Sequence, residues 1–227
     1  VSASRAGRDA AEGAVAIAIT PDNKTGVLIV LNCETDFVGK NDSFIALTQK
    51  ILDKALESKA ATKDALLKET MDGMTIEEKL TEQTGIIGEK LEIGGYEVLE
   101  GAFVATYIHA GNKLAAIVGM NEEAAEAGRN VAMQAAAMNP VSLSRDGVSQ
   151  EVIDRELEVG KDLARQEGKP EAILDKIAEG RLNKFFKEST LLEQDYIRDG
   201  KLSITKYLDS VKKGLTITGF KRVGLGV

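Results

Sequence analysis

The chain has 227 residues, of which 43% are hydrophobic and 29% charged, and its net charge is −7. This length and composition are typical of a globular protein with one large or two small domains, and they exclude a disordered chain. The acidic balance argues against tight non-specific binding to nucleic acid and favours a basic protein surface as partner. The one cysteine, Cys33, excludes an internal disulfide, and no apolar run is long enough to span a bilayer, so we expect a cytoplasmic protein without a membrane segment.

The first elements predict a β-hairpin. Residues Gly13 to Thr20 alternate small and β-branched apolar side chains, which is typical of a strand. Turn-forming residues follow at 21–26, and Val27 to Cys33 reads as the second strand.

Three helices are predicted next. Asp42 is expected to cap the first, because apolar residues then recur at helical spacing. The residues expected on its buried face are Phe44, Leu47, Thr48, Ile51, Leu52 and Ala55. Two shorter helices follow, and the second begins with Thr75 and Glu78 at the spacing of a capping box and is expected to end near Gly85.

The segment from Glu97 repeats this opening pattern. A strand at Ala102 to Ile108, a turn, a strand at Leu114 to Met120 and a helix at Ala124 to Met138 are predicted. The second copy passes from strand to helix in a few residues, whereas the first inserts Glu34 to Asn41 at the same joint. We predict that this inserted loop carries function, because loops longer than a scaffold needs are often functional.

A third region has two charged helices, Ser149 to Glu167 and Glu171 to Lys187, joined by Gly168-Lys169-Pro170. Their narrow apolar seams predict an antiparallel coiled coil. A helix at Ser203 to Val211 and a strand at Leu215 to Val223 follow.

The predicted fold class is α+β, with two related α/β subdomains of antiparallel strands and packed helices, plus an inserted antiparallel coiled-coil helical hairpin. The expected domains are a first core subdomain at 1–96, a second at 97–142 and 192–227, and the inserted hairpin, a possible dimerisation module, at 143–191.

The residues that could support catalysis are few. His109 is the only histidine, which excludes a histidine metal cluster, and the sequence contains no phosphate-binding glycine motif. Cys33 lies in a strand pattern and reads as a small buried side chain, although a dyad with His109 is an alternative. We therefore predict a non-enzyme without catalytic residues, metal or cofactor.

Phe37 is the exception in the inserted loop, where it lies between Asp36 and Lys40. One interpretation is that it folds back as a plug over the sheet, as large apolar residues usually do. The other is that it is an exposed anchor for a partner protein.

The run from Leu31 to Asn41, with Thr35-Asp36-Phe37-Val38 at its centre, resembles the signature of the bacterial elongation factor Ts family. Further segments agree in order over essentially the whole chain; they are residues 7–13, 87–90, 107–111, 168–170, 179–181 and 218–220. Gly39 departs from the alanine or serine that the family often has. We expect the chain to lack the family's small helical N-terminal domain and its frequent C-terminal extension.

The resemblance implies a factor that binds elongation factor Tu and speeds the release of GDP, without itself binding nucleotide or nucleic acid. Thr35 and Val38 belong to the implied partner-binding motif, in which Asp36 and Phe37 would enter the partner's GTPase domain near its magnesium site. Three further residues match family positions that press on the region linked to the partner's phosphate loop; they are Ile87, Gly88 and His109.

Ordinary structural roles are open alternatives for two of these residues, since Gly88 could serve a turn and His109 could end a strand. Two other functions are also open. One is a coiled-coil scaffold or dimer-forming structural protein without exchange activity, and the other is a small-molecule enzyme that uses Cys33 or His109.

Overall fold

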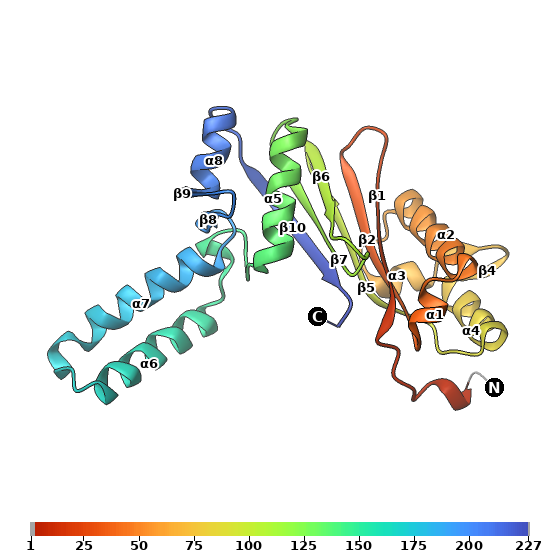
Figure 1. The fold of residues 1–227 in the computed structure, drawn as a ribbon, viewed down its shortest axis with the longest axis horizontal. Helices are drawn as coiled ribbons and strands as arrows, with labels where there is room; N and C mark the ends of the chain where they lie inside the picture. Colours follow the sequence, from red (N-terminus) through yellow and green to blue (C-terminus); the bar gives the residue numbers. More distant parts are fainter. Residues whose placement is uncertain (1–2, 227) are drawn as a thin grey trace. The chain divides into compact units, whose positions relative to one another are not determined.

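The computed structural model describes residues 3–226. The chain divides into two compact units, of which the first takes in the chain up to Ala136 together with the stretch from Thr218, and the second runs from Ala137 to Ile217. The helices and strands make it a mixed α/β protein with antiparallel sheets (Figure 1). Within the described residues, no helix is long and apolar enough to cross a membrane.

The first sheet contains β1 (Glu12–Ile19), β2 (Thr25–Cys33) and β5 (Glu92–Glu100) in the order β1-β2-β5, with both pairs antiparallel. The predicted hairpin β1–β2 is confirmed. Its turn is stabilised by the Asp22 carboxylate, which accepts hydrogen bonds from the Thr20 hydroxyl at 2.6 Å and the Lys24 backbone N–H at 3.0 Å. Every residue of the central strand β2 is buried, because both faces of the sheet are covered.

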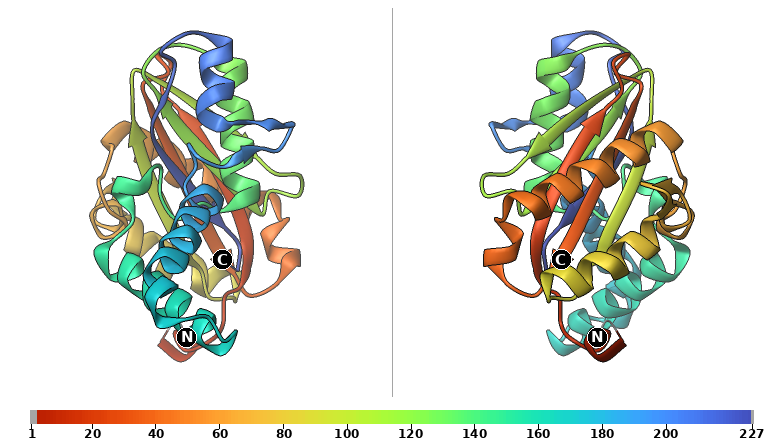
Figure 2. Two further views of the ribbon diagram at one scale, coloured as in Figure 1. Left: turned by 90° about the vertical axis from the view of Figure 1, so that its left-hand side faces the viewer. Right: turned by 90° about the vertical axis from the view of Figure 1, so that its right-hand side faces the viewer.

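Helices cover one face of this sheet (Figure 2). They are α1 (Asp36–Gly39), α2 (Asp42–Ser58), α3 (Lys63–Leu67) and α4 (Ile76–Ile87), with the short strands β3 (Thr70–Met71) and β4 (Met74–Thr75) before α4. The buried residues of α2 are the six predicted ones: Phe44, Leu47, Thr48, Ile51, Leu52 and Ala55. The N-cap is Asn41 and not Asp42, because the Asn41 side chain accepts the Ser43 backbone N–H at 2.9 Å.

Helix α4 begins as predicted and ends later. Thr75 and Glu78 form the capping box, with hydrogen bonds of 3.1 and 2.9 Å to each other's backbone N–H. The prediction that the helix ends near Gly85 is wrong, since it continues to Ile87. Gly88 is its C-cap with φ of +89°, a left-handed conformation that glycine adopts without steric cost.

The second sheet contains β6 (Phe103–Ile108), β7 (Leu114–Met120) and β10 (Ile217–Gly224) in the order β10-β7-β6. Both sheets thus consist of a hairpin with a third strand beside its second strand, and a helix follows each hairpin. Helix α5 (Ala125–Met138) packs on β6 and β7 at Gly128, where an added Cβ would come within 2.5 Å of the Ala105 Cβ. The two strand–strand–helix segments predicted from the sequence are therefore both present.

The two sheets of the first unit also pack on each other. Their shared core comes from both β-layers and consists of Val15, Leu28, Val30, Val104, Ala115, Ile117 and Val223. A separate core fills the space between the first sheet and helices α2 to α4. The strand β2 contributes to both cores, which is why it reads as an unbroken apolar run rather than as an alternating pattern.

The second unit contains α6 (Gln150–Gln166), α7 (Leu174–Ser189) and α8 (Ile204–Val211), with a two-stranded sheet of β8 (Asp195–Tyr196) and β9 (Asp199–Ser203). Single turns of 3₁₀ helix occur at Ala3–Arg5, Arg145–Gly147 and Glu171–Ile173. Helices α6 and α7 lie side by side (Figure 1), and Gly160 of α6 directly faces the backbone of Ala178 in α7. That this pair is an inserted coiled-coil module, with the domain limits given above, stays a prediction.

Candidate functional site

The inserted loop that carries Phe37 contains a single helical turn, α1, which we had not predicted. Thr35 is its N-cap, and its carbonyl accepts the Gly39 N–H at 3.2 Å while its hydroxyl accepts the Val38 N–H at 3.4 Å. Val38 packs against the core below. Phe37 precedes it by one residue, about 100° around the helix axis, and points outward with 83% of its surface exposed. The plug interpretation of Phe37 is therefore wrong.

Two carboxylates hold this turn against the chain that follows α4. The Glu89 carboxylate accepts three hydrogen bonds from the turn: the backbone N–H groups of Glu34 and Thr35 at 3.0 Å each, and the Thr35 hydroxyl at 2.6 Å. In return, the Glu34 carboxylate accepts the backbone N–H of Lys90 at 2.7 Å. These hydrogen bonds connect two segments that are more than fifty positions apart in sequence. Charge-assisted hydrogen bonds of this kind are stronger than neutral ones.

The end of α4 adds an apolar residue that sequence reasoning missed. Ile76, Leu80 and Thr84 are buried, and Ile87 continues this face and packs on the core. Ile86 lies off that face and is 69% exposed. The helical periodicity of 76, 80, 84 and 87 was the available signal that Ile87 is partly a core residue and that Ile86 is the outward one.

The turn α1 and the end of α4 meet at a small cavity of about 310 Å³. It is lined by Val38, Asn41, Ser43, Phe44, Ile86 and Ile87. Two of the segments singled out from the sequence, 35–38 and 87–88, are thus brought together, because Val38 of the first and Ile87 of the second line the same hollow.

His109 lies in a different segment, the turn between β6 and β7. Its Nδ1 is 3.0 Å from the Tyr107 hydroxyl, and the Arg129 guanidinium lies over the Tyr107 ring at 5.6 Å from the ring centroid. The turn is attached to the outer edge of β1, because the Val15 N–H donates to the Asn112 carbonyl at 3.1 Å. His109 therefore has the hydrogen bond of an ordinary strand-end histidine, and it is exposed beside this edge.

A groove of about 800 Å³ runs along this edge of β1. Residues from α1, α2 and the β6–β7 turn line it, among them Asp36, Ile45, Ile108 and Lys113. The motif residue Asp36 and the turn that carries His109 thus border one hollow. Asp36 is exposed and 3.7 Å from Lys40 on the same turn, a pairing that contributes little to stability at such a solvated site.

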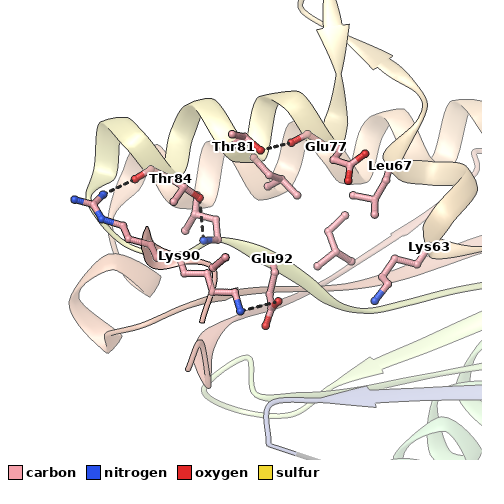
Figure 3. Close-up of a pocket in the computed structure, with 12 residues that line it drawn as sticks. Lys63, Leu67, Glu77, Thr81, Thr84, Lys90 and Glu92 are labelled. Atoms are coloured by element: carbon pink, nitrogen blue, oxygen red, sulfur yellow. Dashed lines mark hydrogen bonds and ion pairs between the residues drawn. The ribbon is translucent and has the colours of Figure 1, made fainter. Parts of the chain in front are cut away.

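Thr84 secures the C-terminal end of α4 from two sides (Figure 3). Its carbonyl accepts a hydrogen bond from Arg5 Nη1 at 2.9 Å, and its hydroxyl accepts the backbone N–H of Leu91 at 3.1 Å. A second cavity of about 310 Å³ lies beside it, between α4 and β5, where the Lys90 ammonium is 3.5 Å from the Glu92 carboxylate. The stretch before and after Gly88 is therefore fixed by contacts on both flanks.

Cys33 does not have the environment of a nucleophile. It is fully buried at the end of β2, and its Sγ donates to the Thr35 carbonyl at 3.1 Å. Burial, with the nearby charge of Glu89 as a second cause, raises the pKa of the Cys33 thiol to about 11. A thiol in this state remains protonated near neutral pH, which argues against the Cys33–His109 dyad.

Comparison with known proteins agrees with the sequence motif. A family model described as "Elongation factor TS" matches residues 34–227. Proteins named elongation factor Ts are 51% identical in Christiangramia forsetii and 49% in Flavobacterium psychrophilum, each over 100% of this chain and 83% of the relative. A third, from Porphyromonas gingivalis, is 47% identical over 99% of this chain and 82% of its own length. These matches support a role as a translation elongation factor, and the chain belongs to the elongation factor Ts family.

Proposed function

We propose that this chain is a guanine-nucleotide exchange factor that binds elongation factor Tu in the cytoplasm and promotes the release of GDP. The observation that carries the proposal is Phe37, a large aromatic residue that is 83% exposed on a turn anchored at both ends. Exposed aromatic residues on rigid supports are the side chains that dominate protein-binding hot spots. The family membership supplies the class of partner.

In the proposed mechanism, Phe37 enters a pocket on the GTPase domain of the partner, with Asp36 beside it and Thr35 and Val38 supporting the turn. GTPases hold their nucleotide largely through Mg²⁺ and through backbone donors around the phosphates. An anchor that displaces these elements weakens GDP binding without contacting GDP. The exchange factor then performs no bond chemistry and needs no cofactor of its own.

The other contact residues are proposed to act on the phosphate-binding region of the partner. Ile87 packs on the same core as Val38, the neighbour of Phe37, and Ile86 now joins the proposed contact residues as the exposed apolar residue. His109 is proposed to contact the partner from the β6–β7 turn. We do not expect these residues to bind nucleotide or nucleic acid directly.

A scaffold or dimer-forming role stays as a second proposal. It is favoured by the exposed apolar residues Val159 and Leu163 of α6 and Ile173 of the 3₁₀ turn before α7, which are 46%, 39% and 42% exposed. Sedimentation of the chain over a range of concentrations tests whether the α6–α7 pair forms a homodimer. A monomer at all concentrations would remove the dimer proposal and leave the exchange proposal intact.

The exchange proposal is tested by release of fluorescent GDP from elongation factor Tu, with and without this chain. We expect the release rate to rise with the concentration of the chain and to saturate. Linkage requires that GDP weakens binding of the chain to its partner by the same ratio by which the chain weakens GDP. An affinity for the partner that does not change with GDP and Mg²⁺ would contradict exchange.

A further inference from the structure

We infer that Glu89 is a positioning residue, which holds the Phe37 turn and the end of α4 in one fixed arrangement so that both segments meet the partner as a single surface. This inference rests on the proposed exchange function and deepens it. It concerns a residue that does not itself need to touch the partner.

The first argument is geometric. The three hydrogen bonds that Glu89 accepts all come from the base of the turn, at Glu34 and Thr35. The Thr35 hydroxyl donates to Glu89 and accepts the Val38 N–H, so it links the carboxylate to the turn itself. Glu89 also directly follows Gly88, the left-handed residue that ends α4.

The second argument is that the turn has little stability of its own. A helix of four residues cannot persist in isolation, because nucleation of a single turn is unfavourable. Of its residues, only Val38 packs on the apolar core. The hydrogen bonds to Glu89 therefore contribute a large part of the stability of the turn that carries Phe37. Because the turn is already ordered in the free chain, binding of the partner does not have to supply the conformational entropy of ordering it.

Glu34 completes the arrangement, because its carboxylate holds the Lys90 N–H at 2.7 Å while its own N–H is held by Glu89. The two segments thus exchange donors and acceptors in both directions. Arg8 adds a weaker contact, 3.5 Å from the Glu34 carboxylate.

The test compares Glu89→Ala with Glu89→Gln in the full chain. Alanine removes all three acceptor contacts. Glutamine keeps the shape, can still accept the two backbone N–H groups and can donate to the Thr35 hydroxyl, while it removes the charge. We expect Glu89→Ala to lower the maximal rate of stimulated GDP release at least about tenfold, equivalent to about 1.4 kcal/mol, and Glu89→Gln to stay within about threefold of the unmodified chain, a factor equivalent to about 0.65 kcal/mol.

The matched control is Glu82→Ala in α4, the helix that precedes Glu89, where the carboxylate forms an ion pair 3.5 Å from the Lys79 ammonium. We expect this variant to release GDP as the unmodified chain does. If glutamine is as damaging as alanine although its Lys90 amide exchanges as slowly as in the unmodified chain, the charge of Glu89 acts on the partner directly and the positioning role is refuted. A normal rate for Glu89→Ala also refutes it.

A double-mutant cycle with Phe37→Ala adds a readout that loss of stability alone would not change. If Glu89 acts through Phe37, adding Glu89→Ala to Phe37→Ala should lower the rate of stimulated GDP release little further. A full tenfold further loss in the Phe37→Ala background would overturn the inference. Should Glu89→Ala fail to fold, Thr35→Val takes its place, because it removes the hydroxyl that links Glu89 to the Val38 N–H. We expect Thr35→Val to slow stimulated GDP release, and an unchanged rate would overturn the inference.

Amide hydrogen exchange of the free chain separates this inference from the proposed function. In Glu89→Ala the Lys90 amide keeps its acceptor on Glu34, so faster exchange there reports that the two segments have come apart. We expect faster exchange at Thr35, Val38 and Lys90 and no change in β2. Unchanged exchange at Lys90 would refute the inference even if the unmodified chain promotes GDP release. If the unmodified chain promotes no GDP release but the Lys90 amide exchanges faster in Glu89→Ala, only the proposed nucleotide-exchange function fails.

Discussion

The replacement of Phe37 by alanine is the sharpest test of the proposed interface. A buried aromatic side chain covers about 200 Å², and because Phe37 is 83% exposed in the free chain, about 165 Å² is available to a partner. At about 25 cal/mol per Å², full burial of that area corresponds to about 4 kcal/mol. Measured hot spots lie at about 2–4 kcal/mol, which corresponds to a loss of roughly 30-fold to several hundred-fold.

The same exposure predicts the effect on folding. The ring makes few contacts in the free chain, so its removal is expected to change the free energy of unfolding by no more than about 0.5 kcal/mol. The assays are a denaturant midpoint for the isolated variant and the stimulated release of labelled GDP from elongation factor Tu. For an exchange factor, the anchor stabilises the state with loosened GDP, so release should slow more than binding to the nucleotide-free partner weakens.

Two results would refute this reasoning. A loss of about 3–5 kcal/mol in stability, which is typical when a buried phenylalanine is truncated, would mean that the ring packs inside the fold. Normal stability with normal GDP release would mean that Phe37 is exposed without contacting the partner at all.

Three further predictions concern neighbouring residues. Asp36→Asn keeps the shape of the side chain and loses an exposed pairing with Lys40 that contributes little, so we expect stimulated GDP release to fall less than for Phe37→Ala; an equal or larger fall would assign the main contact to the charge. Ile86→Ser should weaken partner binding with little change in the denaturant midpoint, whereas Ile87→Ser should lower the midpoint, because only the latter packs on the core; the reverse pattern would refute the assignment. Because burial raises the pKa of Cys33 from 9.0 to about 11, folding disfavours its thiolate, so this group's contribution to stability is complete below pH 9 and is lost as the pH rises towards 11. Denaturant midpoints from pH 8 to pH 11, compared with those of Cys33→Ala, measure this contribution, and an identical pH dependence in the two proteins would contradict it.

Local patterns in the sequence were sufficient for the elements whose signals lie within one turn or one strand. The six buried residues of α2 follow from helical spacing alone, and the capping box of Thr75 and Glu78 follows from a four-residue pattern. The hairpins β1–β2 and β6–β7 were found for the same reason, since each combines two apolar runs with a short turn.

Strand β5 was missed because its sequence lacks such a signal. It contains two adjacent glycines and three glutamates, residues that strands usually avoid. It is a strand because β2 offers a partner edge, and because Ile93 and Tyr96 then enter the core between the sheet and the helices. Pairing between distant segments overrides the weak local preference here.

By itself, the sequence determined the family, the two hairpin-and-helix segments and the residues of the motif around Phe37, because each depends on neighbours along the chain. Only the tertiary structure decided that this motif contains a helical turn and that Phe37 points outward from it. It also decided that Glu89 holds the base of the turn. The physical reason is that a four-residue helix has no stability of its own and takes its conformation from hydrogen bonds to residues 54 positions away, which no local pattern contains.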